Sequence, residues 1–474
     1  MMHRTTALAL AVLVWLAAAS VTLAAERPPD SPNTLILALD GVGFHHLVAA
    51  RARGAFAGWP EPRPLVSTFP SMTNVGFVAI LSPLGSERML GYEIRYFDHQ
   101  QNQIQGGSLL GYKKQAGAWR EMFDAGTRNA WAKAFSFLWP RREARREMSR
   151  IETLVREQPA ERMLGLIGAS DNLAHLDGDE PTIRFLLEVS ERVETLRREH
   201  AVLHGRPLRV VLVSDHGNGG GKIQAAGGIG RRLEEAGLRP AERLNRPEDV
   251  VLVSYGVCGY GALFLSHERA ETAARAVLGQ VGVDLAAWIS GDGEMRVLGR
   301  DGEALVRWHG SAPTRRLAYE PREGDPLRIA PAQASLVSAG KLDDAGFGAE
   351  RDWFEATASG DYPDPLSRLV DGLEGRFVQN TATVLFSYAP GYALGIPSGR
   401  FGAWLLGGHL EATHGGLDRE SSWGIYLRSD DDGRSAAPMR SDAALAEWAD
   451  SAELQAALDG FRDGSALHRP RILH

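Results

Sequence analysis

Short apolar runs that stop at an acidic residue or lead into one constrain the fold of this sequence more than any other feature. Three of them cover residues 34–39, 163–167 and 210–213, and they lead into Asp40, Asp171 and Asp215. Such runs are typical of strands that are buried on both faces of a parallel sheet. Ligands of these sheets gather beyond the carboxyl ends of the strands, and all three acidic residues fall there.

Helical spacing separates the second run from the third, because apolar residues recur from Ile183 to Leu196 every three or four positions. We therefore expect a crossover helix and an α/β fold. From residue 250 the pattern changes to a helix-like stretch at 268–280 and a hairpin signal at Asp301-Gly302. This change indicates a smaller inserted α+β lobe.

The predicted organisation has a core in two parts and an inserted lobe between them. Residues 338–375 of the lobe read as loops with one or two short helices, and the sheet pattern returns at 383–388 and again at 423–427. A last helix is expected near 443–458. The predicted boundaries are a signal peptide at 1–25, core segments at 26–249 and 376–430, the inserted lobe at 250–375 and a C-terminal helical tail at 431–474.

The N-terminus has the features of a secretory signal. His3 and Arg4 precede an apolar run at 7–19, and cleavage is expected after Ala24 or Ala25. This predicts export to the periplasm or the medium; an uncleaved anchor is the alternative, although the run is short for a membrane span. No later segment is apolar enough to cross a membrane, so no span is expected after signal removal.

The composition of the chain limits the classes of molecule that we expect it to bind. The 474-residue chain has 52 basic and 59 acidic residues, a formal charge of −7, and this mildly acidic balance argues against a nucleic-acid partner. A small-molecule substrate is expected instead. Cys258 is the one cysteine, so no internal disulfide can form, and its apolar, glycine-rich surroundings predict a buried thiol.

Six acidic and histidine residues form the candidate metal-binding set. A two-metal site for phosphoryl transfer needs about six or seven carboxylate and imidazole ligands and a hydroxyl that faces phosphorus. Taken singly, an acid at a strand end is often a helix cap and a lone histidine is often structural. Together, mostly at predicted strand ends, they favour a metal centre made of Asp40, Asp171, His175, Asp215, His216 and His414.

These residues lie in segments that resemble the alkaline phosphatase superfamily, and most of all its nucleotide pyrophosphatase and phosphodiesterase branch. The resemblance spans residues 34–427 and implies a three-layer α/β/α core around a mostly parallel sheet. It is carried by Leu39-Asp40-Gly41-Val42-Gly43, Phe69-Pro70-Ser71-Met72-Thr73-Asn74, Asp171-Asn172-Leu173-Ala174-His175-Leu176-Asp177-Gly178, Ser214-Asp215-His216-Gly217 and Thr413-His414-Gly415.

The resemblance also implies two divalent metal sites and a threonine nucleophile. One site would hold Asp171, His175 and His414, and the other Asp40, Asp215, His216 and the oxygen of Thr73. Three imidazoles among oxygen ligands favour zinc, with manganese or iron as alternatives. The expected activity is hydrolysis of phosphoric esters through a phospho-threonine intermediate.

Thr73 is also favoured by its position before an apolar stretch at 74–81 that reads as a helix. A helix N-terminus stabilises an alkoxide and a phosphate. Ser71 is the nearest rival hydroxyl, and the backbone N–H of Asn74, with its side chain as a further candidate, is expected to hold a phosphoryl oxygen.

The sequence departs from the phosphodiesterase branch in two places. Thr73 is followed by Asn74-Val75-Gly76 and not by a Phe-Pro-Asn-His stretch, and residues 91–98 lack the second asparagine of the branch. Arg95 in that region is a candidate clamp for a phosphate monoester, with a surface ion pair as the alternative. Phosphomonoesterase, phosphonate hydrolase and a catalytically silent metal-binding protein therefore remain alternatives.

Other charged residues have a less specific interpretation. His409 is the rival of His414, and His45 and His46 follow Asp40 closely enough to line the cleft. The basic run on a predicted helix is expected to be a solvated face with ion pairs four residues apart, and it comprises Arg141, Arg142, Arg145, Arg146 and Arg150.

Overall fold

The computed structural model describes residues 31–107, 118–126, 138–221, 223–253, 256–395, 410–430 and 435–449. The predicted signal peptide at 1–25 and the rival ligand His409 lie outside these residues. Within the described ranges, no helix combines the length and the apolar character needed to span a bilayer.

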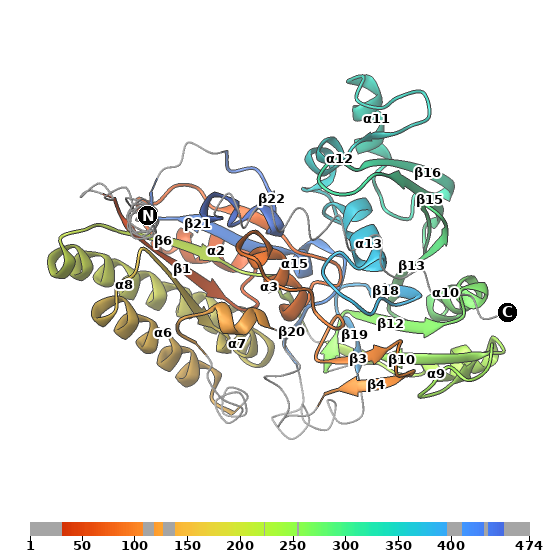
Figure 1. Ribbon diagram of the computed structural model, residues 1–474, viewed down its shortest axis with the longest axis horizontal. Coiled ribbons are helices and arrows are strands. Elements are labelled where there is room, and N and C mark those ends of the chain that lie inside the picture. The colour runs from red at the N-terminus through yellow and green to blue at the C-terminus, as the bar shows by residue number, and fades with distance from the viewer. Residues whose placement is uncertain are drawn as a thin grey trace, which may run out of the picture.

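The first sheet contains the predicted apolar runs. Its six strands have the order β22-β2-β21-β6-β1-β5. β1 pairs in parallel with β5 and β6, while β21 is antiparallel to β2 and β6, so the sheet is mostly parallel (Figure 1). The strands are β1 (Asn33–Leu39), β2 (Arg63–Val66), β5 (Arg162–Ile167), β6 (Leu208–Val213), β21 (Trp423–Arg428) and β22 (Met439–Arg440).

Helices cover both faces of this sheet, so the predicted α/β class is confirmed. In β1, Leu35 and Leu37 pack on one face among side chains of four helices, and Ile36 packs on the opposite face with α3. All three are at most 1% exposed, which explains the unbroken apolar run. The helices are α2 (Phe44–Ala52), α3 (Thr73–Leu81), α6 (Pro140–Glu157) and α8 (Asp179–His204), of which α8 is the predicted crossover, preceded by α7 (Ala169–Asp177).

The second sheet has nine strands in the order β17-β16-β15-β14-β13-β18-β12-β10-β9 (Figure 1). The hairpin predicted at Asp301-Gly302 is confirmed, because β14 and β15 pair antiparallel around it. The strands are β9 (Arg239–Pro240), β10 (Asp249–Val253), β12 (Tyr260–Leu265), β13 (Val283–Gly291), β14 (Glu294–Gly299), β15 (Gly302–His309), β16 (Arg316–Gly324), β17 (Gly348–Ala349) and β18 (Val384–Tyr388).

Helices and short ribbons complete the described chain. The helix expected at 268–280 is α10, and those expected between 338 and 375 are α12 and α13. Cys258 is buried, as predicted. The helices are α9 (Ile229–Glu235), α10 (Ala270–Leu278), α11 (Ala330–Ser338), α12 (Glu350–Thr357), α13 (Pro365–Glu374) and α15 (Arg419–Ser422); the ribbons are β3 (Arg95–Asp98) with β4 (Gln103–Gly106), β7 (Gly219–Gly220) with β20 (Ala412–Thr413), and β8 (Gln224–Ala226) with β19 (Tyr392–Gly395) and β11 (Val257–Cys258).

One strand lies in a different sheet from the one we expected. The run at 383–388 forms β18, which pairs with β12 and β13 in the second sheet and not with the first. An apolar run indicates burial, but the partner strand is set by contacts more than 90 residues away in the chain. The division into core and inserted lobe therefore stays a prediction, and its boundary at residue 376 does not coincide with the change of sheet.

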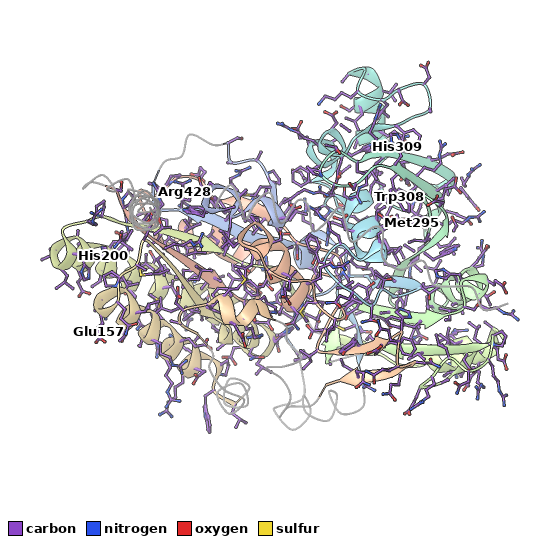
Figure 2. All side chains as sticks on the ribbon, in the orientation of Figure 1. Glu157, His200, Met295, Trp308, His309 and Arg428 are labelled. Carbon is purple, nitrogen blue, oxygen red and sulfur yellow. The ribbon has the colours of Figure 1, made fainter. Side chains whose placement is uncertain are left out.

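The C-terminal segment also differs from the prediction. Residues 441–448 contain two 3-10 turns in place of the start of a helix, and residues beyond 449 lie outside the described ranges. Arg428, labelled in Figure 2, lies at the end of β21. It donates to both carboxylate oxygens of Glu447, and Leu445 is fully buried. These contacts fix the segment against the sheet as short turns.

Candidate metal centre

The structure brings the six predicted ligands together at the carboxyl ends of the central strands. Asp40 follows β1, Asp171 and His175 lie on α7 after β5, and Asp215 and His216 follow β6. His414 directly follows β20. Potential ligand atoms lie within 4.8 Å of one another in two groups, and Asp171 belongs to both: Asp171, His175 and His414 form one, and Asp40, Asp171 and His216 the other.

Close distances link the two groups and include Asp215. His175 Nε2 lies 3.3 Å from Asp171 Oδ2, and His414 Nε2 lies 3.7 Å from Asp171 Oδ1. His216 Nε2 lies 3.2 Å from Asp215 Oδ2 and 3.8 Å from Asp40 Oδ1. The rings of His216 and His414 stack with centroids 3.7 Å apart. The site is therefore one continuous cluster.

Each of the three imidazoles is oriented by a backbone carbonyl. Nδ1 donates to Ala412 O at 2.7 Å in His175, to Gly217 O at 2.9 Å in His216 and to Ser71 O at 2.8 Å in His414. A hydrogen on Nδ1 leaves the lone pair on Nε2, and all three Nε2 atoms face the carboxylates. This is the arrangement in which histidine binds a metal, with its second nitrogen held by the protein.

The carboxylates and imidazoles of the cluster shift one another's pKa values. Burial, together with the charge of Asp40, raises the pKa of Asp215 well above its ordinary value. Burial disfavours the protonated form of His175, but the Asp171 carboxylate outweighs it and raises the pKa of His175 to about 9. Protons thus compensate charge where a divalent cation would do so.

The buried carboxylate of Asp215 supports the same fit. Its Oδ1 accepts the Gly41 N–H at 3.2 Å, whereas Oδ2 accepts no hydrogen bond from the described residues although it is buried. An unsatisfied buried carboxylate oxygen is costly, and a metal ion would satisfy it. Carboxylate and imidazole donors suit zinc, so the residues present fit the implied metal.

Thr73 lies at the edge of this cluster. Its Oγ1 donates to Asp40 Oδ1 at 3.0 Å and lies 3.2 Å from His216 Nε2. Thr73 as a residue is partly exposed, whereas its neighbours in the cluster Asp215 and His216 are fully buried. The rival Ser71 is fully buried, and its hydroxyl bonds the carbonyls of Thr68 and Gly416.

The side chain of Asn74, a further candidate for holding a phosphoryl oxygen, is bonded to residues outside the cluster. Its Nδ2 donates to Glu93 Oε2 at 2.7 Å, and its Oδ1 accepts from Trp119 Nε1 at 3.2 Å. Both polar ends are thus occupied, and only its backbone N–H, in the first turn of α3, stays a candidate for holding a phosphoryl oxygen. Arg95 lies at the start of β3 and forms no hydrogen bond or ion pair with the six ligands.

Sequence reasoning missed two residues that hold the ligands. Asn218 is fully buried, and its Nδ2 donates to Gly41 O at 2.7 Å and to Asp171 Oδ1 at 3.1 Å. Gly41 has a φ of +66°, and a Cβ there would lie 2.2 Å from Asp171 Oδ1. Only their nearness in the sequence to predicted ligands could have pointed to these two residues, because Gly41 follows Asp40 and Asn218 comes two residues after His216.

His46 and Asp179 form a hydrogen-bonded pair outside the six-residue cluster. The Gly43 N–H donates to His46 Nδ1 at 3.2 Å, so the ring carries its hydrogen on Nε2. That nitrogen lies 3.0 Å from Asp179 Oδ1. His45 is more exposed, with Nε2 3.9 Å from the same oxygen. His46 thus donates to a carboxylate and has no lone pair on Nε2 for a metal.

The arginines of α6 are paired differently from the prediction. Arg145 forms a bidentate pair with Glu188 of α8, and Arg146 and Arg150 both bind Glu143. Within α6 the paired residues are therefore three and seven positions apart, and not four as predicted. The pairing follows the buried position of Glu143 and the neighbouring helix, which spacing alone does not indicate.

Comparison with known proteins gives structural likeness only: no protein-family model and no curated protein matches the sequence. Human ectonucleotide pyrophosphatase/phosphodiesterase 5 is 11% identical with a TM-score of 0.46, covering 88% of this chain and 93% of its own, and the murine protein reaches 0.48 at the same identity and coverage. Phosphonoacetate hydrolase from Sinorhizobium meliloti 1021 is 12% identical with a TM-score of 0.47, covering 91% and 97%.

Proposed function

We propose that this chain is an exported, metal-dependent hydrolase of phosphoric esters with Thr73 as its nucleophile, acting on small phosphodiesters. The position of Thr73 Oγ1, 3.0 Å from Asp40 Oδ1 and beside the inward-facing Nε2 of His216, carries the proposal. The hydroxyl of a partly exposed residue among buried carboxylates and imidazoles is the arrangement that in-line attack on phosphorus requires.

Three residues have distinct roles in the proposed reaction. Asp40 holds the hydroxyl hydrogen of Thr73, so that Oγ1 faces the phosphorus. Oγ1 passes its proton to Asp40 and forms the new P–O bond while the bond to the leaving oxygen breaks, and that oxygen takes up a proton from water. A second water then hydrolyses the phospho-threonine, which restores the hydroxyl, and Asp40 releases its proton to solvent. The backbone N–H of Asn74 at the start of α3 is placed to bind a non-bridging oxygen, with the helix dipole adding to its effect.

Two divalent cations, zinc by ligand type, would be held by the six ligand residues. When bound, they lower the pKa of the threonine hydroxyl and neutralise charge on the phosphoryl and leaving oxygens. Asp171 belongs to both groups of potential ligand atoms.

The test compares bis-para-nitrophenyl phosphate, para-nitrophenyl phosphate and a phosphonate ester with zinc-replete protein. We expect the diester to be hydrolysed fastest, and chelation or His216→Ala to abolish the activity. His200→Gln is the control, because His200 is buried and hydrogen-bonded to Asn33 outside the cluster. Faster hydrolysis of the monoester or the phosphonate would favour those alternative activities. Full zinc occupancy with no turnover would instead indicate a silent metal-binding protein.

Export has a separate test. N-terminal sequencing of the mature protein from its native host should start at Ala25 or Glu26, as expected for cleavage after Ala24 or Ala25. A protein that keeps Met1 would contradict a cleaved signal.

A further inference from the structure

One buried guanidinium contacts both of the turns that lead into the metal centre. Arg368 lies on α13, in the lobe that carries the second sheet, and is 3% exposed. Its Nη2 donates to Thr68 O and Ser71 Oγ, both at 2.9 Å. Its Nη1 donates to Leu417 O at 3.1 Å and to Pro363 O at 2.9 Å. It thus joins α13 to the turn before Thr73 and to the loop after His414.

The two turns are also bonded to each other at this point. Ser71 N donates to Gly415 O at 3.4 Å, Ser71 Oγ bonds Gly416 O at 2.9 Å, and His414 Nδ1 donates to Ser71 O at 2.8 Å. Ser71 is therefore shared by the guanidinium and by the imidazole of His414. A displacement of Arg368 would move the residue that orients His414 and that lies two positions before Thr73.

The environment of Arg368 indicates positioning and not charge pairing. Among the described residues Arg368 forms no ion pair, and the described bonds of its Nη atoms go to three carbonyls and one hydroxyl. Asp364 and Asp418 act on it only through space, and burial lowers the pKa of Arg368 to about 9. A buried cation without a bonded carboxylate is costly. Its rigid fork of donors is what a lysine could not reproduce here.

We propose that Arg368 is a positioning residue through which the lobe that carries it sets the placement of Thr73 relative to His414. The catalytic consequence of this inference rests on the proposed function. The set of hydrogen bonds from Arg368 to the two turns, here called the clamp, is a property of the folded chain and does not depend on that function. It gives that lobe a role in the metal centre without contributing a ligand.

The first experiment measures the clamp in metal-free protein. We expect Arg368→Lys to increase amide hydrogen exchange in residues 67–72 and 414–418. The control is Arg315→Lys, because Arg315 is equally buried and its ion-pair partners Glu350 and Asp371 belong to neither turn. It should lower the melting temperature without a selective increase at the two turns. Unchanged exchange at both turns in Arg368→Lys would overturn the proposal.

The second experiment measures the consequence for the ligands. Loss of a residue that supports a metal ligand typically lowers metal affinity about 10–100-fold, and we expect this fall in zinc affinity for Arg368→Lys but not for Arg315→Lys. Arg368→Lys should lower kcat by a larger factor than it raises KM. Equal loss of zinc affinity in both variants would show a general loss of stability and contradict positioning.

Ser71→Ala provides a second route if Arg368→Lys does not fold. It removes one partner of the guanidinium and leaves the lobe intact, and it should increase exchange at residues 415–417. If the wild-type protein binds zinc but cleaves no ester, the proposed function fails. The exchange and affinity measurements still decide on the clamp.

Discussion

The backbone oxygen of Ser71 lies 2.8 Å from Nδ1 of His414, which joins the turn before Thr73, the proposed nucleophile, to the last of the six candidate ligands. The carbonyl and not the side chain accepts this hydrogen bond. The hydroxyl of Ser71, the rival nucleophile in the sequence, is fully buried beside it. The two hydroxyls in this turn therefore have different expected roles.

Replacing the side chain of Ser71 should weaken the turn without removing the reaction. Ser71→Ala keeps the carbonyl that orients His414 and loses three hydrogen bonds of the hydroxyl. At about 1 kcal/mol each, these losses should lower the free energy of unfolding by about 1–3 kcal/mol. Because the bonds hold the turn and do not contact the phosphorus, turnover should fall but stay measurable. The measurement is kcat beside that of Thr73→Ala in the same preparation. Equal, complete losses in the two variants would contradict this division of roles.

Zinc binding should depend on pH through His175. Its pKa in the metal-free protein is about 9, so the ring is protonated below that pH and must lose its proton to bind a metal. Zinc affinity should therefore rise with pH, by about tenfold per pH unit for each proton displaced, and level off above pH 9. Calorimetry in buffers of different ionisation enthalpy measures the released protons. Affinity that is independent of pH between 6 and 9 would contradict this role for His175.

Much of the core could be predicted because its signals are local. The runs that became β1, β5 and β6 are apolar throughout because both of their faces are covered, and the periodicity of α8 shows in the residues that it buries. The sheet to which β18 belongs could not be predicted, since its apolar pattern fits either sheet. The turns at 441–448 depend on the pairing of Arg428 with Glu447, which joins segments from two elements.

Asn218 should support metal binding through Asp171. Its amide donates to Asp171 Oδ1 at 3.1 Å, and Asn218→Asp would place a second carboxylate there. We expect zinc affinity to fall by about 10–100-fold, as for other residues that orient a metal ligand. Competition with a chelator of known affinity measures it. The control is Asn102→Asp, because Asn102 is partly buried and its side chain bonds the backbone of Leu244 and none of the six candidate ligands. Unchanged affinity in Asn218→Asp would rule out this support.

Gly41 should tolerate no side chain, for a reason that a second glycine separates from backbone strain. Gly41 and Gly85 both have positive φ, +66° and +86°, but a Cβ at Gly85 meets no atom within 4 Å. Gly85→Ala should cost about 1 kcal/mol of stability from strain alone. Gly41→Ala adds a clash with Asp171, so about 2–4 kcal/mol and a loss of zinc affinity are expected. Denaturant unfolding and zinc titration measure the two effects, and equal effects of both substitutions would contradict the account.

The convergence of the six candidate ligands could be predicted because each is a charged or imidazole side chain at a recognisable position at or near the end of a strand. The supporting residues could not, because their roles depend on contacts across the chain. Asn218 reads as an ordinary polar residue until the structure places it between Gly41 and Asp171, and Arg368 lies 297 positions from its partner Ser71. The side chain of Asn74 was misjudged because Glu93 and Trp119 occupy it.

Mass spectrometry of acid-quenched enzyme tests the central claim most directly, since a phosphoryl group trapped during turnover marks the nucleophile. Zinc-replete protein mixed with excess bis-para-nitrophenyl phosphate should yield the peptide around Thr73 with the mass of the nitrophenyl phosphoryl adduct, and fragmentation should locate it on Thr73. The adduct should be absent in Thr73→Ala, which still binds zinc. An adduct on Ser71, or full turnover by Thr73→Ala, would contradict the account.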